Sequence, residues 1–461
     1  MMDLGGAAIV VGGRSPTSSW TRVFRRVTID SRTIREGDLF VALKGERFDG
    51  HDFVEESLKR GAAGALIRSD SAARYGRDAP CIAVRDTRLA LGQLARNWRA
   101  RFSLPLIAVA GSNGKTTVTQ MIASILREHA GPAAFHTEGN LNNDIGLPLT
   151  LLRLLPQHRV GVVELGMNHR GEIAYLSGIA RPKIALVNNA QREHQEFMQS
   201  VADVAAENAS IFDFLPCDGT AIVNADDAFA QFFLDRAGAR PTMTFGMNHA
   251  ADVRGTMGEA AFGSHLHLST AAGQVDVALR IAGRHNAMNA VAAAAAALAV
   301  GVPLSVVARG LASFVPVAGR LAKTMMPTGA VVLDDTYNAN PDSVRAAIDV
   351  LHGIGGRRVL VLGRMAEVGE QGPAFHREVG TYARERAIDA LFTLGPEAAE
   401  AAQAFGAGAE TYADVEAVIE AARAVALPGT TLLVKGSRSA RMERVVQALL
   451  GQSAAVQEEI H

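Results

Sequence analysis

The sequence predicts an α/β protein with three domains: a small α/β N-terminal domain, a central domain with a mostly parallel sheet, and a C-terminal Rossmann-like domain. The chain has 461 residues, more than a single hydrophobic core usually holds. Its length alone therefore indicates roughly three domains. From residue 104 onward, short apolar runs alternate with helical patterns, as in sheets covered by helices. A glycine-containing turn at 111–117 separates an apolar run from a helical pattern.

Composition narrows the class of protein. Hydrophobic residues make up 48% and charged residues 20%, as in soluble globular proteins. With a formal net charge of −1, the protein has no overall positive potential that would attract nucleic acid or an anionic membrane. Cys81 and Cys217 lie far apart without metal-ligand spacing, which fits a reducing compartment. The N-terminus lacks a secretory signal pattern, and the most apolar helix candidate, 290–302, is too short to span a bilayer. We therefore expect a cytoplasmic protein without membrane insertion and without a nucleic-acid partner.

The N-terminal domain is predicted over residues 1–103. Alternating and apolar runs indicate short strands, and apolar residues at helical spacing from Leu89 to Phe102 indicate a helix that leads out of the domain. The expected strands are 27–32, 39–43, 65–67 and 81–84.

The central domain is predicted over 104–314. Four apolar runs, at 106–110, 160–164, 184–187 and 221–223, indicate buried strands. Shorter alternating runs around Met243, Val253, 265–268 and 275–279 favour an appended antiparallel edge. An alanine-rich helix over about 286–300 closes this domain.

The C-terminal domain is predicted over 315–461. Short apolar runs at 331–333, 359–362, 390–392 and 432–434, separated by helical patterns, indicate a doubly wound sheet. Such sheets bind ligands at the carboxyl ends of their strands.

The turn after 106–110 has the chemistry of a phosphate-binding loop. It contains Gly111, Ser112, Asn113, Gly114, Lys115, Thr116 and Thr117. Backbone N–H groups at a helix start attract anions, a lysine adds charge near the β- and γ-phosphates, and a threonine hydroxyl can reach Mg²⁺. The usual first glycine of this motif is replaced by Val109. An ordinary turn is the alternative, but Lys115 falls at the junction between strand and helix, where a phosphate-binding loop needs its lysine.

Two further residues are candidate metal ligands beside this loop. Glu164 ends the strand 160–164, and His194 follows the strand 184–187. A carboxylate next to the phosphate strand is a typical ligand for nucleotide-bound Mg²⁺, and a neutral imidazole can also bind a divalent ion. A capping carboxylate and a solvated histidine are the alternatives.

Other polar segments follow predicted strands or begin helices, where ligands typically bind. Asparagines suit amide or carboxylate groups but also favour turns, Asn286 can simply cap its helix, and a lone arginine can simply be solvated. These candidates are Asn140, Asn142 and Asn143; Asn286 and Asn289; Arg320; Asp335, Asn338 and Asn340; and Lys435, Ser437 and Arg438.

These motifs together resemble the Mur ligases of bacterial peptidoglycan synthesis, along nearly the whole chain. Residues 30–32, 37–42 and 49–51 resemble the family's UDP-binding signature, which assigns Ser31 and Arg32 to substrate binding. Residues 111–117 resemble its ATP loop, which also lacks the first glycine. Residues 164–173 with His194 resemble the magnesium segments, and 283–289 the adenine segment. Residues 319–320, 334–341 and 435–438 resemble the dipeptide-adding member.

The resemblance implies a central P-loop ATPase domain, a UDP-substrate-binding N-terminal domain and a C-terminal domain that binds the amine. It implies that ATP and Mg²⁺ activate the terminal carboxylate of UDP-N-acetylmuramoyl-tripeptide as an acyl phosphate, which the amine of D-alanyl-D-alanine attacks, releasing phosphate. Lys115, Glu164, His194 and Arg320 are then the catalytic candidates. Asn286, Asn289, Arg320 and Asp335 join the loop in binding the nucleotide, and Thr116, Glu164 and His194 hold metal.

The sequence departs from the family at two places. Many Mur ligases carry a carbamylated lysine that bridges to a second Mg²⁺, but the aligned position here is Asn208, and no lysine lies between Lys183 and Lys323. We therefore expect the neighbouring Glu207 to supply the anionic oxygen. The family's usual Gly-Asp-Met turn reads Gly363-Arg364-Met365, so Arg364 is left out of the site.

Other function classes fit parts of the same pattern. A P-loop kinase or ATPase would stop at phosphoryl transfer, and a nucleotide-dependent scaffold would do no chemistry. Within the ligases, the alternative is an enzyme that adds another residue, such as diaminopimelate, lysine or a glutamate in folate chemistry. The sequence leaves open whether the third residue of the tripeptide is diaminopimelate or lysine.

Overall fold

The computed structural model describes residues 1–46, 48–260 and 262–452. It contains three large sheets with four, nine and six strands, together with a two-stranded ribbon. The four-stranded sheet lies within 1–103, the nine-stranded sheet within 104–314 and the six-stranded sheet within 315–461. The predicted α/β architecture is confirmed, and the exact domain boundaries stay predictions.

The N-terminal sheet is parallel, in the order β3-β4-β5-β6. Asp86 accepts hydrogen bonds from the N–H groups of Arg88 and Leu89, so its side chain caps the helix that leaves this domain. The elements are β1 (Met2–Asp3), α1 (Leu4–Val10), β2 (Val23–Phe24), β3 (Arg26–Thr28), β4 (Asp38–Val41), α2 (Val54–Lys59), β5 (Gly64–Arg68), β6 (Cys81–Val84) and α3 (Thr87–Arg99).

The central sheet has the order β15-β14-β13-β12-β11-β10-β7-β9-β8. Its first part comprises β7 (Leu106–Ala110), α4 (Lys115–Ala130), β8 (Ala134–His136), α5 (Gly146–Leu151), β9 (Val160–Glu164), α6 (Glu172–Ala180), β10 (Ile184–Val187) and α7 (Val201–Ala209). Its second part comprises β11 (Thr220–Asn224), α8 (Ala230–Ala237), β12 (Thr242–Gly246), β13 (Val253–Ala260), β14 (Gly263–Thr270), β15 (Gly273–Leu279), α9 (Arg284–Ala299) and α10 (Leu304–Ser313).

Strand β7 is buried on both faces of this sheet. Ile107 and Val109 face the core formed with α4, α9 and α10, whereas Ala108 and Ala110 face the core on the opposite side. β7 pairs with β10 on one side and β9 on the other, with Ala110 opposite Val187 and Val109 opposite Glu164. The carboxyl ends of three strands therefore meet where the phosphate loop begins.

The expected antiparallel edge is partly wrong. β12 pairs in parallel with β11, and the next strand, β13, also pairs in parallel with β12. Among the described residues of this sheet, only the pairs β13–β14 and β14–β15 are antiparallel. Helix α8 lies between β11 and β12 and forms the crossover that joins these two parallel strands, which the short alternating run around Met243 does not reveal.

The C-terminal sheet has the order β16-β17-β21-β18-β19-β20 and is parallel except for β16. Helices cover both faces, since Leu360 and Leu362 enter one core while Val359 and Val361 enter the other. The strands are β16 (Ala322–Met325), β17 (Val331–Asp335), β18 (Arg357–Leu362), β19 (Ala390–Leu394), β20 (Ala409–Tyr412) and β21 (Thr430–Lys435). The helices are α11 (Pro341–His352), α12 (Gly372–Glu385), α13 (Pro396–Phe405), α14 (Val415–Val425) and α15 (Glu443–Leu449).

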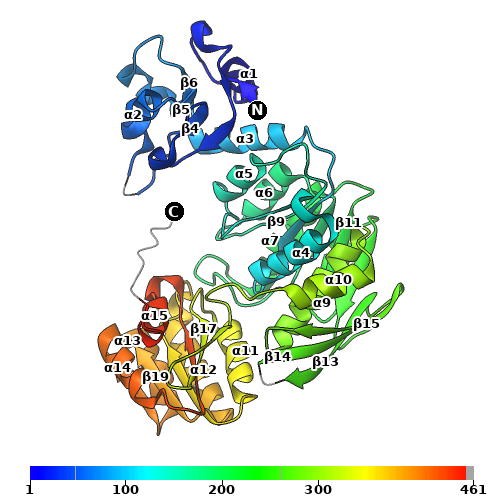
Figure 1. Ribbon diagram of the computed structural model, residues 1–461, viewed down its shortest axis with the longest axis vertical. Coiled ribbons are helices and arrows are strands. Elements are labelled where there is room, and N and C mark those ends of the chain that lie inside the picture. The colour runs from blue at the N-terminus through cyan, green and yellow to red at the C-terminus, as the bar shows by residue number, and fades with distance from the viewer. Residues whose placement is uncertain (47, 261, 453–461) are drawn as a thin grey trace.

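The central domain contacts both of the others (Figure 1). The N-terminal domain, blue in Figure 1, joins it through α3, where Trp98 Nε1 donates to the Leu154 carbonyl at 3.1 Å and Arg99 Nε to the Ala180 carbonyl at 3.0 Å. The C-terminal domain, yellow to red, contacts the central domain through the loops around the phosphate turn.

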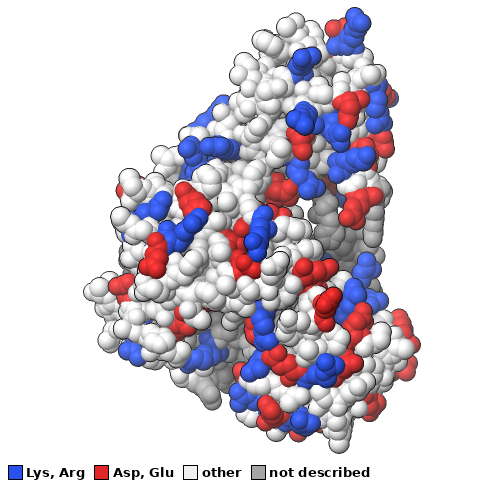
Figure 2. All heavy atoms as spheres, turned by 180° about the vertical axis from the view of Figure 1, so that it is seen from behind, with Lys and Arg blue, Asp and Glu red and all other residues white. Residues whose placement is uncertain are grey.

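Figure 2 shows Lys and Arg interspersed with Asp and Glu over one face of the molecule. Among the helices of the described residues, none is both long and apolar enough to cross a membrane.

Candidate active site

The turn after β7 forms the centre of the site. Gly111, Ser112, Asn113 and Gly114 connect β7 to α4, which begins with Lys115, Thr116 and Thr117. Gly114 has a φ of +85°, and a Cβ there would lie 2.4 Å from Asn289 Oδ1. Glycine alone adopts this backbone without displacing its neighbours. The loop therefore directs the N-terminal end of α4, with its backbone N–H groups, toward an anion.

Asparagine side chains support this loop. The carbonyl oxygen of Asn113 accepts hydrogen bonds from Asn188 Nδ2 at 2.8 Å and from Asn189 Nδ2 at 2.9 Å. Asn188 Nδ2 also donates to Asn289 Oδ1 at 2.9 Å, and Asn289 Nδ2 donates to Asn286 Oδ1 at 3.3 Å. The start of α9 therefore lies beside the phosphate loop, as expected for nucleotide residues, and contact with adenine stays a prediction.

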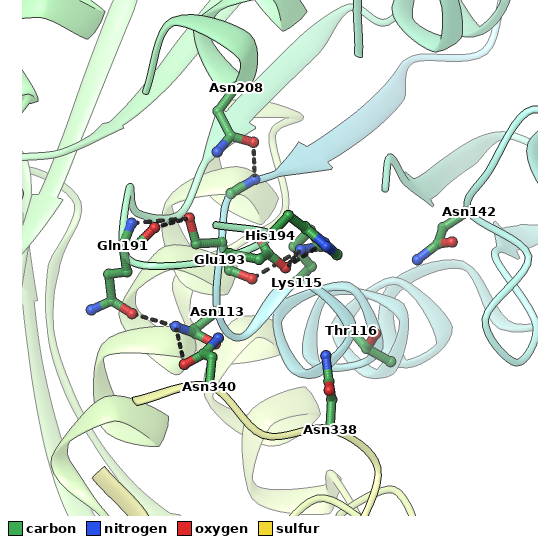
Figure 3. Close-up of polar contacts among 12 residues, drawn as sticks. Asn113, Lys115, Thr116, Asn142, Gln191, Glu193, His194, Asn208, Asn338 and Asn340 are labelled. Atoms are coloured by element: carbon green, nitrogen blue, oxygen red, sulfur yellow. Dashed lines mark hydrogen bonds and ion pairs between the residues drawn. The ribbon is translucent and has the colours of Figure 1, made fainter. Parts of the chain in front are cut away.

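Lys115 is paired with a buried carboxylate (Figure 3). Its Nζ lies 2.8 Å from Glu193 Oε1 and 2.9 Å from the Ser112 carbonyl oxygen. Burial opposes the charge of Glu193, but Lys115 and His194 outweigh burial and lower the pKa of this carboxyl. A bound polyphosphate would compete with Glu193 for the Lys115 ammonium.

His194 lies between two carboxylates. Its Nδ1 is 2.6 Å from Glu367 Oε2 in the C-terminal domain, and its Nε2 is 3.5 Å from Glu193 Oε1. Burial lowers the pKa of His194, but the two neighbouring carboxylates, Glu193 and Glu367, raise it to about 9. In this arrangement the ring is a cationic bridge between two domains. Metal binding by His194, which requires a neutral ring nitrogen, stays a prediction.

The catalytic candidates Glu164 and Arg320 meet at one hydroxyl. Thr116 Oγ1 donates to Glu164 Oε2 at 2.7 Å and accepts from Arg320 Nη2 at 2.8 Å. Asn142 Nδ2 donates to the second oxygen of Glu164, also at 2.7 Å. The Arg320 guanidinium lies over the Tyr337 ring, 4.1 Å from its centroid. The structure thus brings a C-terminal arginine into the central phosphate site.

The donor set around Thr116 and Glu164 fits Mg²⁺. The described residues contain no cluster of three or more His, Cys, Asp or Glu side chains that could hold a metal alone. Mg²⁺ bound with a nucleotide typically takes one or two protein oxygens and completes its shell with phosphate oxygens and water. The buried carboxylate and hydroxyl supply the protein oxygens.

Glu207 is engaged at the start of α6. Its two carboxylate oxygens accept hydrogen bonds from Gly171 N at 2.8 Å and Ile173 N at 2.9 Å. The neighbouring Asn208 accepts a hydrogen bond from Gly111 N through Oδ1 at 2.9 Å (Figure 3). Asn208 is therefore a support of the phosphate loop. In this arrangement Glu207 caps a helix, and its metal contact stays a prediction.

The polar C-terminal candidates form a cluster at the ends of β17 and β21. Lys435 Nζ lies 2.5 Å from Asp335 Oδ2 and donates to the Asn338 carbonyl at 3.0 Å. Asn340 Nδ2 donates to Asn113 Oδ1 at 2.9 Å, which places this cluster beside the phosphate loop (Figure 3). Ser437, whose Oγ donates to the Ala339 carbonyl at 3.2 Å, and Arg438 follow β21 in the same cluster.

Four substrate candidates have local structural contacts. Ser31 and Arg32 form a 3-10 turn in the N-terminal domain, and Arg32 Nε pairs with Asp30 Oδ1 at 3.0 Å. Asn143 Oδ1 accepts from Gly146 N at 2.8 Å and caps the start of α5. The carbonyl of Asn140 accepts from Asn142 N at 2.7 Å. Their contacts with substrate stay predictions.

The segment after β10 contains site residues that the sequence reading did not assign. Gln191 Oε1 accepts from Asn113 Nδ2 at 2.6 Å, Glu193 pairs with Lys115, and Arg192 pairs with C-terminal carboxylates. Their position after a strand at the ligand-binding edge is a signal for function. The sequence pattern does not show which way each of these side chains points, so it could not predict their partners.

Comparison with known proteins matches all three domains. The Mur ligase family, catalytic domain, matches residues 23–99, the Mur ligase middle domain residues 109–297, and the Mur ligase, glutamate ligase domain, residues 319–438. The chain is 44% identical over 427 residues to the UDP-N-acetylmuramoyl-tripeptide–D-alanyl-D-alanine ligase of Escherichia coli K12, covering 92% of this chain and 93% of that protein. The enzyme of that name from Bacillus subtilis is 33% identical, with 93% of each chain covered.

Solved structures agree with this likeness. A crystal structure of MurF from Acinetobacter baumannii matches with a TM-score of 0.90 and 33% identity, covering 98% of this chain and 99% of that one. MurF ligase from Thermotoga maritima in complex with ADP matches with a TM-score of 0.83 and 27% identity, covering 94% and 98%. With three matching domains and relatives of this identity along nearly its whole length, the chain belongs to the Mur ligase family.

Proposed function

We propose that this protein is the ATP-dependent, ADP-forming ligase that joins D-alanyl-D-alanine to UDP-N-acetylmuramoyl-tripeptide in peptidoglycan precursor synthesis. The family and the relatives, which are named for this reaction and align over nearly the whole chain, support the assignment. The contact between Arg320 of the C-terminal domain and Thr116 of the phosphate loop is the observation that carries it. A ligase needs its ATP site and its amine-binding domain in contact, whereas an ATPase does not.

The reaction proceeds in two steps. A carboxylate oxygen of the tripeptide attacks the γ-phosphorus of ATP, the bond to the leaving ADP oxygen breaks, and an acyl phosphate forms. The amine of D-alanyl-D-alanine then attacks the acyl carbon, the bond to phosphate breaks, and the amine loses a proton. Lys115 and Arg320 donate to phosphate oxygens as negative charge moves toward ADP.

Thr116 and Glu164 are the residues that would hold Mg²⁺, which neutralises charge on the β- and γ-phosphates when bound. Asn142 fixes the orientation of the Glu164 carboxylate through a 2.7 Å hydrogen bond. We assign His194 to the same site after its release from Glu367. Because Glu367 belongs to the C-terminal domain, that release is coupled to the position of this domain.

The three domains divide the recognition of three ligands. We assign Ser31 and Arg32 of the N-terminal domain to the UDP end of the precursor, and Asn140, Asn142 and Asn143 to the peptide end. The polar C-terminal cluster reaches the phosphate loop through the hydrogen bond between Asn340 and Asn113, and we assign it to the dipeptide and the nucleotide. Its members are Asp335, Asn338, Asn340, Lys435, Ser437 and Arg438. The reaction belongs in the cytoplasm, where ATP is available.

An ADP-release assay with ATP, Mg²⁺ and UDP-N-acetylmuramoyl-tripeptide tests this function. We expect sustained release only when D-alanyl-D-alanine is added, with the ligated product detected by mass spectrometry. D-Alanine, L-lysine and diaminopimelate serve as alternative amines. Equal rates with any of these single amino acids, or equal release without an amine, would contradict the assignment.

A further inference from the structure

The segment from Gln191 to His194 lies between the phosphate loop and the C-terminal domain, and its side chains alternate between the two. Gln191 contacts Asn113, and Glu193 contacts Lys115, both in the phosphate loop or at its end. Arg192 and His194, the residues between and after them, contact carboxylates of the C-terminal domain. One short segment thus joins the ATP site to the domain assigned to the amine.

Arg192 makes the most extensive polar contact in this segment. Its Nη2 lies 2.5 Å from Asp342 Oδ1, and its backbone N–H donates to the other oxygen of Asp342 at 3.0 Å. Its Nη1 lies 2.7 Å from Glu378 Oε2, and its Nη2 also donates to Glu378 Oε1 at 3.0 Å. The guanidinium carbon lies 5.3 Å from the centroid of the Phe375 ring.

These partners come from two different helices of the C-terminal domain. Asp342 is in the first turn of α11, and Glu378 is on α12. The planar, forked guanidinium of arginine can bind both carboxylates together, whereas the single ammonium of a lysine cannot reproduce this geometry. The side chains of Arg192, Asp342 and Glu378 are only 25–29% exposed, so solvent screens the three charges less than at an open surface.

Asp342 also lies two residues after Asn340, which binds the phosphate-loop residue Asn113. The carboxylate clamp and this amide pair therefore hold the same end of α11 against the central domain. Arg320, the C-terminal arginine that reaches Thr116, depends on the same placement of the domain.

We infer that Arg192 is a positioning residue that docks the C-terminal domain on the ATP site by binding Asp342 and Glu378 together. Docking by Arg192 holds Arg320 at the phosphate loop. The docking does not depend on which amine is used, and its consequence for catalysis rests on the proposed ligase function.

Arg345 supplies a matched control. It also binds Glu378, with Nη1 3.0 Å from Oε1, but it lies on α11 inside the C-terminal domain. Removing Arg345 takes a cation from the same carboxylate without breaking a contact between domains. Arg192→Ala and Arg345→Ala therefore separate docking from local charge balance.

Docking is measured without substrates by the distance between two spin labels. Cys217 in the central domain is exposed and accepts one label, Cys81 is buried, and Gln403→Cys on the exposed side of α13 accepts the other. We expect one narrow distance distribution in the doubly labelled parent protein. Arg192→Ala should broaden or shift this distribution, Arg192→Lys should do so less, and Arg345→Ala should leave it unchanged.

Kinetics give the second readout. Arg192→Ala should lower kcat for ligation about tenfold or more, while the Kd for ATP, measured by calorimetry, stays within about threefold because the phosphate loop is intact. In a double-mutant cycle, Arg192→Ala and Glu378→Ala should affect the label distances less than additively. An unchanged distance distribution in Arg192→Ala, or an equal effect of Arg345→Ala, would overturn the inference even if ligation is established. If Arg192→Ala loses docking but the parent protein shows no ligase activity, only the proposed function is overturned.

Discussion

Single residues in the phosphate site have polar partners that a substrate would replace. Lys115 binds Glu193, Thr116 binds Glu164 and Arg320, and a triphosphate with its metal would take over part of these contacts. Such exchange lets the site hold its charges in place before the nucleotide arrives, so less reorganisation is needed when charge develops during transfer.

Lys115→Ala should lower ADP release by about a hundredfold or more, because the ammonium that neutralises the transferring phosphoryl group is lost. The assay contains ATP, Mg²⁺ and both acceptor substrates. Lys183→Ala is the control, since Lys183 pairs with Asp218 at the surface and should keep the parent rate. Retention of parent activity by Lys115→Ala would exclude a catalytic role for the loop.

The buried side chain of His285 should make the stability of the protein depend on pH. Burial lowers the pKa of His285 to about 4, because the charged form loses solvation in the fold. In the unfolded chain this histidine binds its proton near pH 6.5. The free energy of unfolding therefore keeps its full value above that pH and falls as the pH drops toward 4. The expected loss is about 3 kcal/mol, taken from the difference in pKa.

Urea unfolding of the parent protein and of His285→Gln from pH 7.5 to 4 measures this term. The parent should lose stability more steeply between pH 6.5 and 4 than the variant. Parallel pH dependence of both proteins would show that His285 is not kept neutral by the fold.

At the level of elements, the sequence predicted the buried parts well and the edges poorly. Strands 106–110, 160–164 and 184–187 match β7, β9 and β10 because each is a short apolar run buried on both faces. The short edge strands β8, β16 and β20 were missed, since few of their side chains are buried and their pattern is weak. The parallel pairing of β12 depends on a crossover, which periodicity does not report.

In the candidate site, too, some residues were predictable from the sequence and others were not. Lys115 and Thr116 were predicted from the glycine-containing motif between a strand and a helix, and Glu164 from its place at the end of a strand, where parallel sheets bind ligands. The pairing of Lys115 with Glu193 and the docking contact of Arg192 were not, because they depend on side-chain directions in a loop without periodic structure. The capping role of Glu207 also depends on how α6 and α7 pack, which lies beyond sequence pattern.

The turn into α4 should be sensitive to a single methyl group. Gly114→Ala places a Cβ 2.4 Å from Asn289 Oδ1 and requires a positive φ of +85°, so we expect a raised KM for ATP and about 1–3 kcal/mol lower stability. Gly131→Ala, at the other end of α4, also has a positive φ but meets no atom within 4 Å. It should lower stability without changing the KM for ATP. Equal KM values in the two variants would contradict the close approach to Asn289.

At the level of the whole molecule, the candidate catalytic groups come from two domains. The central domain supplies the phosphate loop and Glu164, while the C-terminal domain supplies Arg320 and the polar cluster at the end of β17. In the proposed reaction, we expect the central set to supply most of the affinity for the nucleotide and phosphoryl transfer to need both sets.

Arg320→Ala tests this division between binding and transfer. Because Arg320 comes from the C-terminal domain, its loss should leave the Kd for ATP within about threefold and lower kcat by about a hundredfold. Lys115→Ala should weaken both. Lys323→Ala is the control, since Lys323 lies on β16 and stacks on Phe262, 3.8 Å from the ring centroid, instead of contacting the phosphate loop. Isothermal titration calorimetry and ADP release give the two quantities. If Arg320→Ala kept the parent kcat, transfer would not need the C-terminal arginine, and the contact between Arg320 and Thr116 would be structural only.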